Sequence, residues 1–524
     1  MRTSASVLVL VFCAASLRAQ SASSPEARAA AAYDRALRGG PMTLRAFLVG
    51  FPKGADLHVH LSGAVYAETF IRDAAEDGIC VDTVALAFAT PPCTGSLVPA
   101  TDLSRATGAD SQNLYGRLID SLSTRGFVSS PGRLGHDRFF GTFHRFGAVS
   151  RSHASEWVDE LASRAAAQNE QYLEIMTAPP NDSAAQIARA LGASAALSGP
   201  EASVEDFARL RQALLDRGLR DRTATGREFA RATEAGRQRI EHCGTPQATA
   251  ACKVEIRYLY VVLRDTPPEE VFAQALLAME TVQASMDAGE GGYVGINFAQ
   301  QEDGFLSMRD YTLQMRMVGY LHSVYPRVHV SLHAGELAPG LVPPDGLRFH
   351  IRQAVEIAHA ERIGHGVDVM AEDGAEDLLK EMAAEHVAVE INLTSNAIIL
   401  GVEGAEHPLP AYRAAGVPVA LSTDDEGVSR IDLTHEYVMA AREYRLRYAD
   451  LKEMARTGME HAFLPGAGLW ARPDAFTAPV AACRGQTLGG DTSSAACKTF
   501  LDGSQKAAAQ WELERRFRAF EAGF

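Results

Sequence analysis

Short apolar runs alternate with longer amphipathic stretches along most of the chain. The short runs have the length and composition of β-strands, whereas many connecting stretches, such as EEVFAQALLAMETVQASMD and GAEDLLKEMAAEH, are compatible with helices. Strands are predicted at 55–61, 171–178, 253–263, 292–299, 327–335, 362–369, 387–394 and 417–424. Strands that alternate with helices favour a parallel sheet with right-handed crossovers, and eight such units predict an α/β fold, a (β/α)8 barrel of the TIM type.

Segments on either side of this pattern, and two long connections inside it, are expected to add helices to the barrel. The alanine- and arginine-rich segment 20–50 is predicted to be helical, and the barrel is expected to occupy 51–470. The connections near 80–135 and 182–252 are longer than a βα unit requires, so we expect insertions packed near the barrel mouth. The tail, 471–524, ends in another helical stretch.

The first residues, MRTSASVLVLVFCAASLRAQ, have the layout of a secretory signal. Arg2 precedes an apolar run from Ala5 to Leu17, and small residues follow around Ala19. The run is too short to span a bilayer comfortably, so a cleaved signal at 1–19 is favoured over an anchoring or disordered N-terminus. We therefore expect an exported protein, periplasmic or secreted, with no stable membrane insertion after cleavage.

The spacing of the cysteines agrees with export. Cys13 lies in the predicted signal, and the other six form pairs that are close in sequence: Cys80 and Cys93, Cys243 and Cys252, and Cys483 and Cys497. Six cysteines allow fifteen connectivities, of which this local pairing needs the least rearrangement of the chain. Disulfides belong to oxidising compartments, so the cysteines and the predicted signal indicate the same location.

The charge of the chain restricts its partners. Its 524 residues carry a formal net charge of −15, and 47% of them are hydrophobic. Nucleic-acid binding depends on basic surface and counterion release, so no nucleic-acid partner is expected. A neutral or cationic small substrate fits this charge better. The N-terminal helix and the insertions could serve a homodimer.

Polar side chains follow the ends of several predicted strands. PKGADLHVHLSGA places His58 and His60 on one face of the first strand, because residues i and i+2 of a strand point the same way. The residues at these strand ends are His58, His60, His333, Glu336, His365, Asp424 and Asp425. Each also has an ordinary interpretation, such as a structural histidine or a helix N-cap. Because these strand ends share one rim of a barrel, three histidines and a carboxylate there favour a zinc site with one position left for water.

Six blocks of the sequence resemble those of one enzyme family. PKGADLHVHLSGA, SLHAGE, RIGHGVDV, EINLTSN, HPLP and ALSTDDE occur in the order and approximate spacing of adenosine deaminases in the amidohydrolase superfamily. The resemblance covers roughly residues 51–460. With its predicted signal and cysteine pairs, the chain is somewhat similar to an exported branch, the adenosine deaminase-like growth factors.

This resemblance implies zinc-dependent hydrolysis of adenosine or 2′-deoxyadenosine to inosine or 2′-deoxyinosine and ammonia. One zinc ion per chain would be bound by His58, His60, His333 and Asp424. Glu336 would donate a proton to purine N1, and Asp425 would hydrogen-bond N7. His365 would orient the attacking water and stabilise its charge, or take its proton.

The resemblance also assigns substrate contacts to His60, Ser62, Phe139, Phe143, Gln300 and Asp425. Phe139 and Phe143, in HDRFFGTFHRFG, match an apolar lid over the purine, although both also suit an ordinary helix core. Gln300, in GINFAQQED, stands where the family has a glycine next to purine N3. Ser62 stands where many members have an aspartate that meets the ribose 5′ hydroxyl.

Further differences from the family pattern affect the predicted substrate more than the predicted reaction. Asn392 and Leu393 replace the usual Cys-Pro, and Glu426 replaces a common proline. Adenine, a 5′-modified adenosine and another aminopurine are alternative substrates, and AMP is less favoured because no Lys/Arg cluster lies beside the matched blocks. A growth-factor-like binding protein without catalysis is a further alternative. The P-C-x-x-C pair of cytidine deaminases and the H-E-x-x-H motif of zincins are absent from the sequence.

Overall fold

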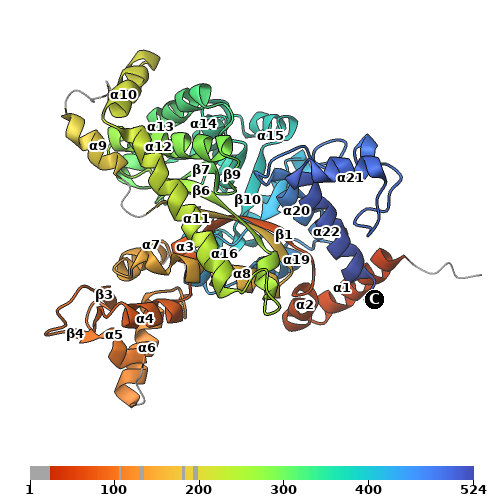
Figure 1. Ribbon diagram of the computed structural model, residues 1–524, viewed down its shortest axis with the longest axis horizontal. Coiled ribbons are helices and arrows are strands. Elements are labelled where there is room, and N and C mark those ends of the chain that lie inside the picture. The colour runs from red at the N-terminus through yellow and green to blue at the C-terminus, as the bar shows by residue number, and fades with distance from the viewer. Residues whose placement is uncertain (1–23, 105–107, 129–134, 180–182, 193–196, 198) are drawn as a thin grey trace, which may run out of the picture.

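Eight parallel strands form the central barrel of the protein in a computed structural model, which describes residues 24–104, 108–128, 135–179, 183–192, 197 and 199–524 (Figure 1). The strands, in their order around the barrel, are β1 (Gly54–His60), β5 (Glu170–Thr177), β6 (Glu255–Leu263), β7 (Tyr293–Ala299), β8 (His329–Ala334), β9 (Arg362–His365), β10 (Ala388–Ile391) and β11 (Val419–Leu421). Each overlaps a predicted strand. The predicted (β/α)8 barrel is therefore confirmed.

The barrel closes between its first and last strands. In the described part of the chain, β1 and β11 meet through an isolated bridge between Val59 and Asp424. The Asp424 N–H donates to the His58 carbonyl (2.8 Å), and the His60 N–H donates to the Asp424 carbonyl (3.0 Å). This seam places the two histidines at the end of β1 next to Asp424.

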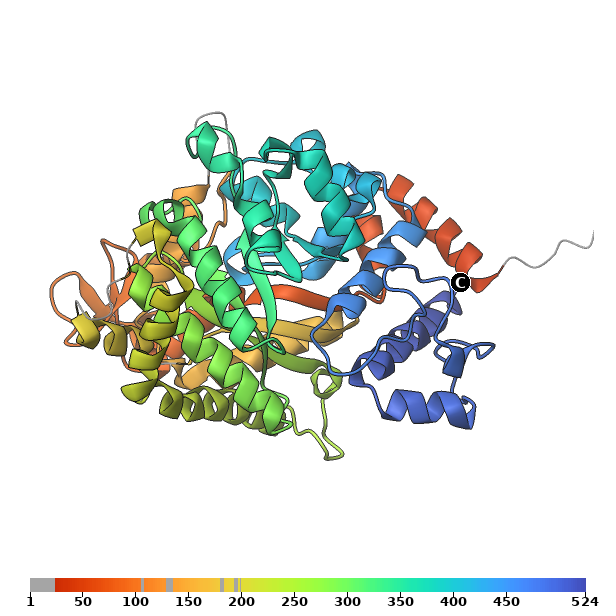
Figure 2. The same cartoon turned by 90° about the horizontal axis from the view of Figure 1, so that it is seen from above.

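Helices surround the barrel (Figures 1 and 2). All residues of β5 and β7 are buried, as expected for strands that have helices outside and layers of side chains inside. The main helices around the barrel are α8 (Ala154–Ala167), α11 (Thr223–Ile240), α12 (Pro268–Asp287), α13 (Phe305–Val324), α14 (His350–Glu356), α15 (Ala375–Ala384), α17 (Leu409–Ala415), α19 (Leu433–Glu443) and α20 (Tyr448–His461).

The two long connections carry extra elements. In the first, three short strands form a small antiparallel sheet that projects with its helices from one side of the barrel (Figure 1). These elements are α4 (Ala67–Glu76), β2 (Cys80–Asp82), β3 (Ala87–Ala89), β4 (Leu97–Pro99), α5 (Ala100–Ser104), α6 (Ala109–Ser121) and α7 (His136–Phe146). The second connection is helical and contains α9 (Ala184–Leu191), α10 (Val204–Asp216) and α11.

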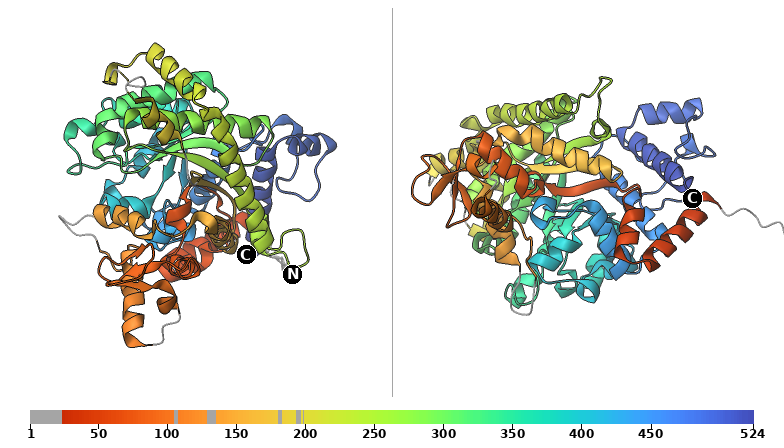
Figure 3. Two further views of the ribbon diagram at one scale, coloured as in Figure 1. Left: turned by 60° about the vertical axis from the view of Figure 1, so that its left-hand side comes forward. Right: turned by 90° about the horizontal axis from the view of Figure 1, so that it is seen from below.

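The two ends of the described chain lie side by side against α20 (Figures 1 and 3). α1 (Pro25–Arg38) and α22 (Gln505–Glu521) contact α20 and each other, whereas α2 (Pro41–Leu48) packs on α1 and α19, and α21 (Ala495–Asp502) packs on α22. The Ser24 hydroxyl caps α1 by accepting the Ala27 N–H (3.1 Å). Lys452 on α20 donates to Glu26 of α1 (3.1 Å) and to Glu521 of α22 (2.7 Å). One ammonium group thus links both terminal helices to the barrel.

The three local cysteine pairs are formed as disulfides: Cys80–Cys93, Cys243–Cys252 and Cys483–Cys497. Two lie in the long connections and the third in the C-terminal extension, so none of the three links barrel strands to one another. The predicted signal, 1–19, lies outside the described residues. Within the described ranges, every helix is too short or too polar to span a bilayer.

Candidate metal centre and active site

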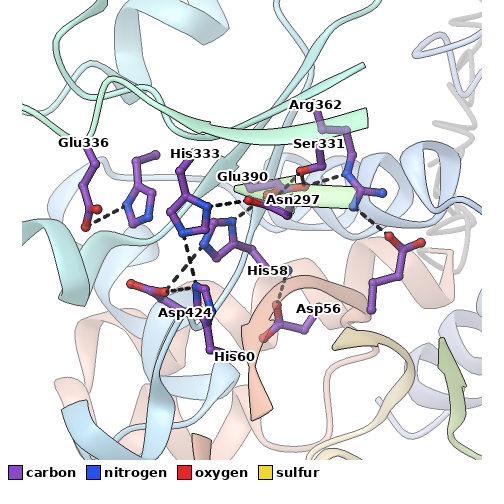
Figure 4. Close-up of polar contacts among 12 residues, drawn as sticks. Asp56, His58, His60, Asn297, Ser331, His333, Glu336, Arg362, Glu390 and Asp424 are labelled. Carbon is purple, nitrogen blue, oxygen red and sulfur yellow. Dashed lines mark hydrogen bonds and ion pairs between the residues drawn. The ribbon is translucent and has the colours of Figure 1, made fainter. Parts of the chain in front are cut away.

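Four predicted ligands converge at the seam of the barrel. Figure 4 shows the side chains of His58, His60, His333 and Asp424 pointing toward one another. His58 and His60 come from β1, His333 from β8, and Asp424 lies three residues after the end of β11. Asp424 has a left-handed backbone (φ 59°), a conformation that costs about 1–3 kcal/mol in a non-glycine residue and is often found at functional sites.

Three distances between the ligand atoms are close to those around one metal ion. Asp424 Oδ1 lies 3.3 Å from His60 Nε2 and 3.6 Å from His58 Nε2, and the Nε2 atoms of His60 and His333 are 3.2 Å apart. Ligands at about 2.0–2.1 Å from a tetrahedral ion lie about 3.3 Å from each other. His58 Nε2 is buried and has no hydrogen-bond partner among the described residues, which fits an atom reserved for a metal.

Glu390, on β10, fixes the orientation of His58. Its Oε2 lies 2.7 Å from His58 Nδ1, and its Oε1 accepts from Arg362 Nε (2.6 Å). Burial alone would raise the pKa of Glu390, but Arg362 and His58 outweigh this effect and lower the pKa to about 2. An ionised carboxylate only accepts hydrogen bonds, so His58 carries its proton on Nδ1 and directs the lone pair of Nε2 to the centre.

The same glutamate orients His333 through two intermediate side chains. Ser331 donates to Glu390 Oε1 (3.1 Å), and the amide nitrogen of Asn297 donates to the Ser331 hydroxyl (3.1 Å). The carbonyl oxygen of Asn297 therefore accepts from His333 Nδ1 (2.6 Å), which leaves the lone pair of His333 on Nε2. Glu390, Asn297 and Ser331 are not among the residues predicted from the sequence. The charge of Glu390 inside the apolar run VAVEINLT was the available signal.

His365 has the opposite tautomer. The Leu409 N–H donates to His407 Nδ1 (3.1 Å), so His407 donates from Nε2 to the Asn396 carbonyl oxygen (3.0 Å). The amide nitrogen of Asn396 then donates to His365 Nδ1 (2.9 Å). Burial lowers the pKa of His365 to about 3, so the ring is neutral and its proton is on Nε2.

This tautomer decides between two roles for His365. His365 offers a ring nitrogen within 4.8 Å of the ligand atoms of His58, His333 and Asp424, and is therefore a geometric candidate for a metal ligand. A protonated Nε2 has no lone pair for a metal and cannot take a proton from water. It can donate a hydrogen bond to an attacking oxygen. The blocks EINLTSN and HPLP supply the two residues that hold this tautomer, Asn396 and His407.

Glu336 and Asp425 face a cavity of about 560 Å³ beside the four converging side chains. Burial, followed by the charges of Asp424 and Glu302, raises the pKa of Glu336 well above its usual value. This direction favours the neutral carboxylic acid form of Glu336. Asp425 Oδ1 is buried without a hydrogen-bond partner in the described part of the chain, and a side chain at Gly63 would collide with it, since an added Cβ would lie 1.4 Å away.

The predicted substrate-contact residues line this cavity: His60, Ser62, Phe139, Phe143, Gln300 and Asp425. Phe139 is 1% exposed and packs edge-on against Phe143, so these rings combine a place in helix packing with a place in the cavity wall. Gln300 has a left-handed backbone (φ 80°), which accounts for a glycine being favoured at this position. Its side-chain oxygen accepts the Asp265 N–H (2.9 Å).

Comparison with known families agrees with this centre. A family model described as adenosine deaminase matches residues 132–468, well over half of the chain. The chain belongs to the adenosine deaminase family. The matched region contains His333, Glu336, His365 and both aspartates, whereas His58 and His60 precede it.

Individual members of the adenosine deaminase family match only part of the chain. It is 33% identical over 192 residues to an adenosine deaminase of Shewanella loihica, covering 36% of this chain and 50% of that protein. It is 31% identical over 236 residues to an adenosine deaminase of Escherichia coli, covering 39% of this chain and 68% of that protein. The chain thus spans half to about two thirds of the length of these relatives.

A solved structure shares the fold. An amidohydrolase from Burkholderia ambifaria, determined with bound zinc, superposes with a TM-score of 0.50 at 16% sequence identity. The alignment covers 80% of this chain and 88% of that one. At this identity the likeness shows a common barrel architecture.

Proposed function

We propose that the protein is a zinc-dependent deaminase that converts adenosine or 2′-deoxyadenosine to inosine or 2′-deoxyinosine and ammonia. The observation that supports this function is the meeting of His58, His60, His333 and Asp424 beside a cavity that also contains Glu336 and Asp425. The donor set of three histidines and one carboxylate suits zinc. The membership of the family supports the reaction, and the three disulfides support a site of action outside the cytoplasm.

The residues around the cavity have different roles in the proposed reaction. When bound at this centre, zinc supplies Lewis acidity that makes water acidic enough to attack at neutral pH. Glu336, held neutral by burial, donates its proton to purine N1 and so makes C6 electrophilic. His365 donates a hydrogen bond from Nε2 to the attacking oxygen and stabilises its charge. Asp425 binds at N7 and holds the ring in place. Water adds its oxygen to C6; one of its protons goes to the amino group, which leaves as ammonia, and the other restores the proton that Glu336 gave to N1.

A substrate panel tests the proposed function. Purified protein loaded with zinc is incubated with adenosine, 2′-deoxyadenosine or adenine, and the ultraviolet change from an adenine to a hypoxanthine chromophore is followed. We expect the nucleosides to have the higher kcat/KM. Adenosine turning over far more slowly than adenine would reject a nucleoside deaminase. A protein that binds nucleosides without any turnover would instead be a binding protein.

Asn396→Asp should reverse the tautomer of His365. A carboxylate at 396 accepts hydrogen bonds from both His407 and His365, so the proton of His365 moves to Nδ1 and Nε2 can no longer donate. We expect kcat to fall about 10²- to 10⁴-fold, the range seen when a catalytic histidine is held in the wrong tautomer or a proton donor is lost, with one zinc per chain retained. Steady-state kinetics and metal analysis provide the measurement.

His407→Gln is the matched control for this variant. Its side-chain amide keeps a donor toward Asn396, so we expect kcat to stay within about tenfold of the wild type. Equal activity of Asn396→Asp and the wild type would show that the tautomer of His365 does not matter for the reaction.

A further inference from the structure

Arg151 lies in the wall of the active-site cavity. Among the described residues that line the cavity it is the one arginine or lysine, and its neighbours there include the neutral polar side chains of Thr177, Gln274 and Gln300. It begins a short 3-10 turn (Arg151–His153) between α7 and α8. The acidic side chains of the cavity, by contrast, belong to the proposed catalytic centre.

The contacts of Arg151 place it on the outer side of that centre. His60 is in register with Met176 on the neighbouring strand β5. Nη1 of Arg151 donates to the Thr177 hydroxyl (3.4 Å) and to the Ala178 carbonyl (3.1 Å), the next two residues toward the barrel mouth. At about 3.3 Å per strand residue, Arg151 lies roughly 3–7 Å farther out than His60. Ser62, two residues beyond His60, also lines the cavity.

Arg151 has no carboxylate partner in the described part of the chain. Among the described residues its hydrogen bonds use only Nη1, so Nε and Nη2 have no partner there. Burial lowers the pKa of Arg151, and the one group that opposes this effect is the phenol of Tyr293. Arg362, which is fully buried, by contrast contacts Glu174 (2.7 Å) and Glu390 (2.6 Å). Arg151 is exposed to solvent at the cavity wall, so a ligand in the cavity can reach its N–H groups.

We propose that Arg151 binds a phosphate group on the sugar side of the substrate, so that the cavity accepts a purine nucleoside 5′-monophosphate such as AMP. This inference deepens the proposed function and depends on it for the reaction. The free Nε and Nη2 form the planar fork that binds two phosphate oxygens at once. The two contacts of Nη1 fix this fork in advance, which reduces the entropy lost on binding.

The position of Arg151 in the fold explains why AMP was less favoured as a substrate from the sequence. Arg151 lies outside the blocks that resemble the family, and only the packing of the 3-10 turn against the end of β5 brings it to the cavity. The net charge of −15 is a property of the whole chain and repels an anion at long range. Solvent and salt screen that repulsion beyond about 8–10 Å, whereas a contact inside the cavity is screened much less.

The test compares AMP with adenosine in the zinc-loaded full chain. For the wild type and Arg151→Gln, kcat/KM is measured for both substrates, and the ratio of the AMP value to the adenosine value is calculated. We expect the ratio to fall about tenfold or more in Arg151→Gln, as for the loss of a charge-assisted hydrogen bond. Arg151→Lys, which keeps the charge but not the fork, should give an intermediate ratio.

Arg327→Gln is the matched control. Arg327 pairs with Asp287 on the exposed surface at the opposite end of the barrel, just before β8 begins, so the variant makes the same change of charge away from the cavity. We expect it to leave the ratio unchanged. An AMP-to-adenosine ratio that is the same in Arg151→Gln and the wild type overturns the inference while leaving the deaminase function intact.

Binding separates this inference from a failure of the reaction. If the wild type deaminates no aminopurine, the proposed function fails, and the dissociation constants of inosine 5′-monophosphate and inosine are then measured by calorimetry. A preference for the nucleotide that Arg151→Gln reduces at least tenfold supports the phosphate contact. Equal affinities of the wild type for the two ligands overturn it.

Discussion

Glu336→Gln should lower kcat for the preferred substrate by about 10³-fold or more while one zinc per chain remains bound. Glutamine matches the shape of glutamate but has no acidic proton for purine N1. Glu336 is not one of the four converging side chains, so metal binding should survive. Stopped and continuous ultraviolet assays give kcat, and atomic emission gives the zinc content.

The pH dependence of the wild type provides a second measurement of the same group. Burial raises the pKa of Glu336, so the protonated, active form persists to a higher pH than for an ordinary glutamate. Activity should therefore be lost as the pH rises through that raised pKa. The loss of activity at high pH should therefore be absent from the pH profile of Glu336→Gln.

Glu361→Gln is the control for this variant, because Glu361 is an unrelated carboxylate that pairs with His329 near the start of β8. It should keep wild-type kinetics. Unchanged turnover in Glu336→Gln would remove Glu336 from the mechanism.

Asp424→Ala should abolish both zinc binding and turnover. Asp424 supplies the carboxylate of the centre, and its Oδ1 is oriented because the Ser395 hydroxyl donates to Oδ2 (2.6 Å). Removing one of the four protein ligands should reduce bound zinc from one per chain to below about 0.2 after dialysis, with turnover at the detection limit. Metal analysis and the ultraviolet assay measure the two effects.

Two further variants distinguish the loss of a zinc ligand from a general loss of folding. Asp424→Asn keeps a residue type that tolerates the left-handed backbone at this position, and it should also lose zinc. Asp425→Asn changes the neighbouring carboxylate and should keep zinc while losing turnover. Full zinc occupancy in Asp424→Asn and Asp424→Ala would exclude Asp424 as a ligand.

The periodic part of the sequence predicted the barrel well, because eight apolar runs of strand length mark its strands. The predicted strands at 362–369, 387–394 and 417–424 are too long, since the observed strands end at His365, Ile391 and Leu421. The chain leaves the sheet near the residues that face the centre: His365 and Asp424 adopt left-handed backbone, and α16 (Leu393–Ile399) starts directly after Asn392. Apolar composition continues past these points, so periodicity alone cannot locate them.

The residues that orient the centre could not be predicted in the same way. Asn297, Ser331 and Glu390 act together because the register from β7 through β8 and β9 to β10 aligns them, and register is a property of the assembled sheet. Asn396 and His407 lie within blocks that resemble the family, but their role emerges only from the direction of each hydrogen bond. The strands of the small sheet contain three residues each, too few to show alternation.

Because only the isolated bridge between Val59 and Asp424 joins the strands at the seam, a metal bound there would stabilise the barrel as well as take part in the reaction. Elsewhere, neighbouring barrel strands are joined by at least two paired positions, whereas at this seam His58 and His60 on one side face Asp424 on the other. An ion bound to all three would link the two sides of the seam, where the barrel has the fewest paired backbone positions. Loading with zinc should therefore raise the melting temperature, and amide protons at the seam should exchange faster with solvent when a chelator has stripped the ion away.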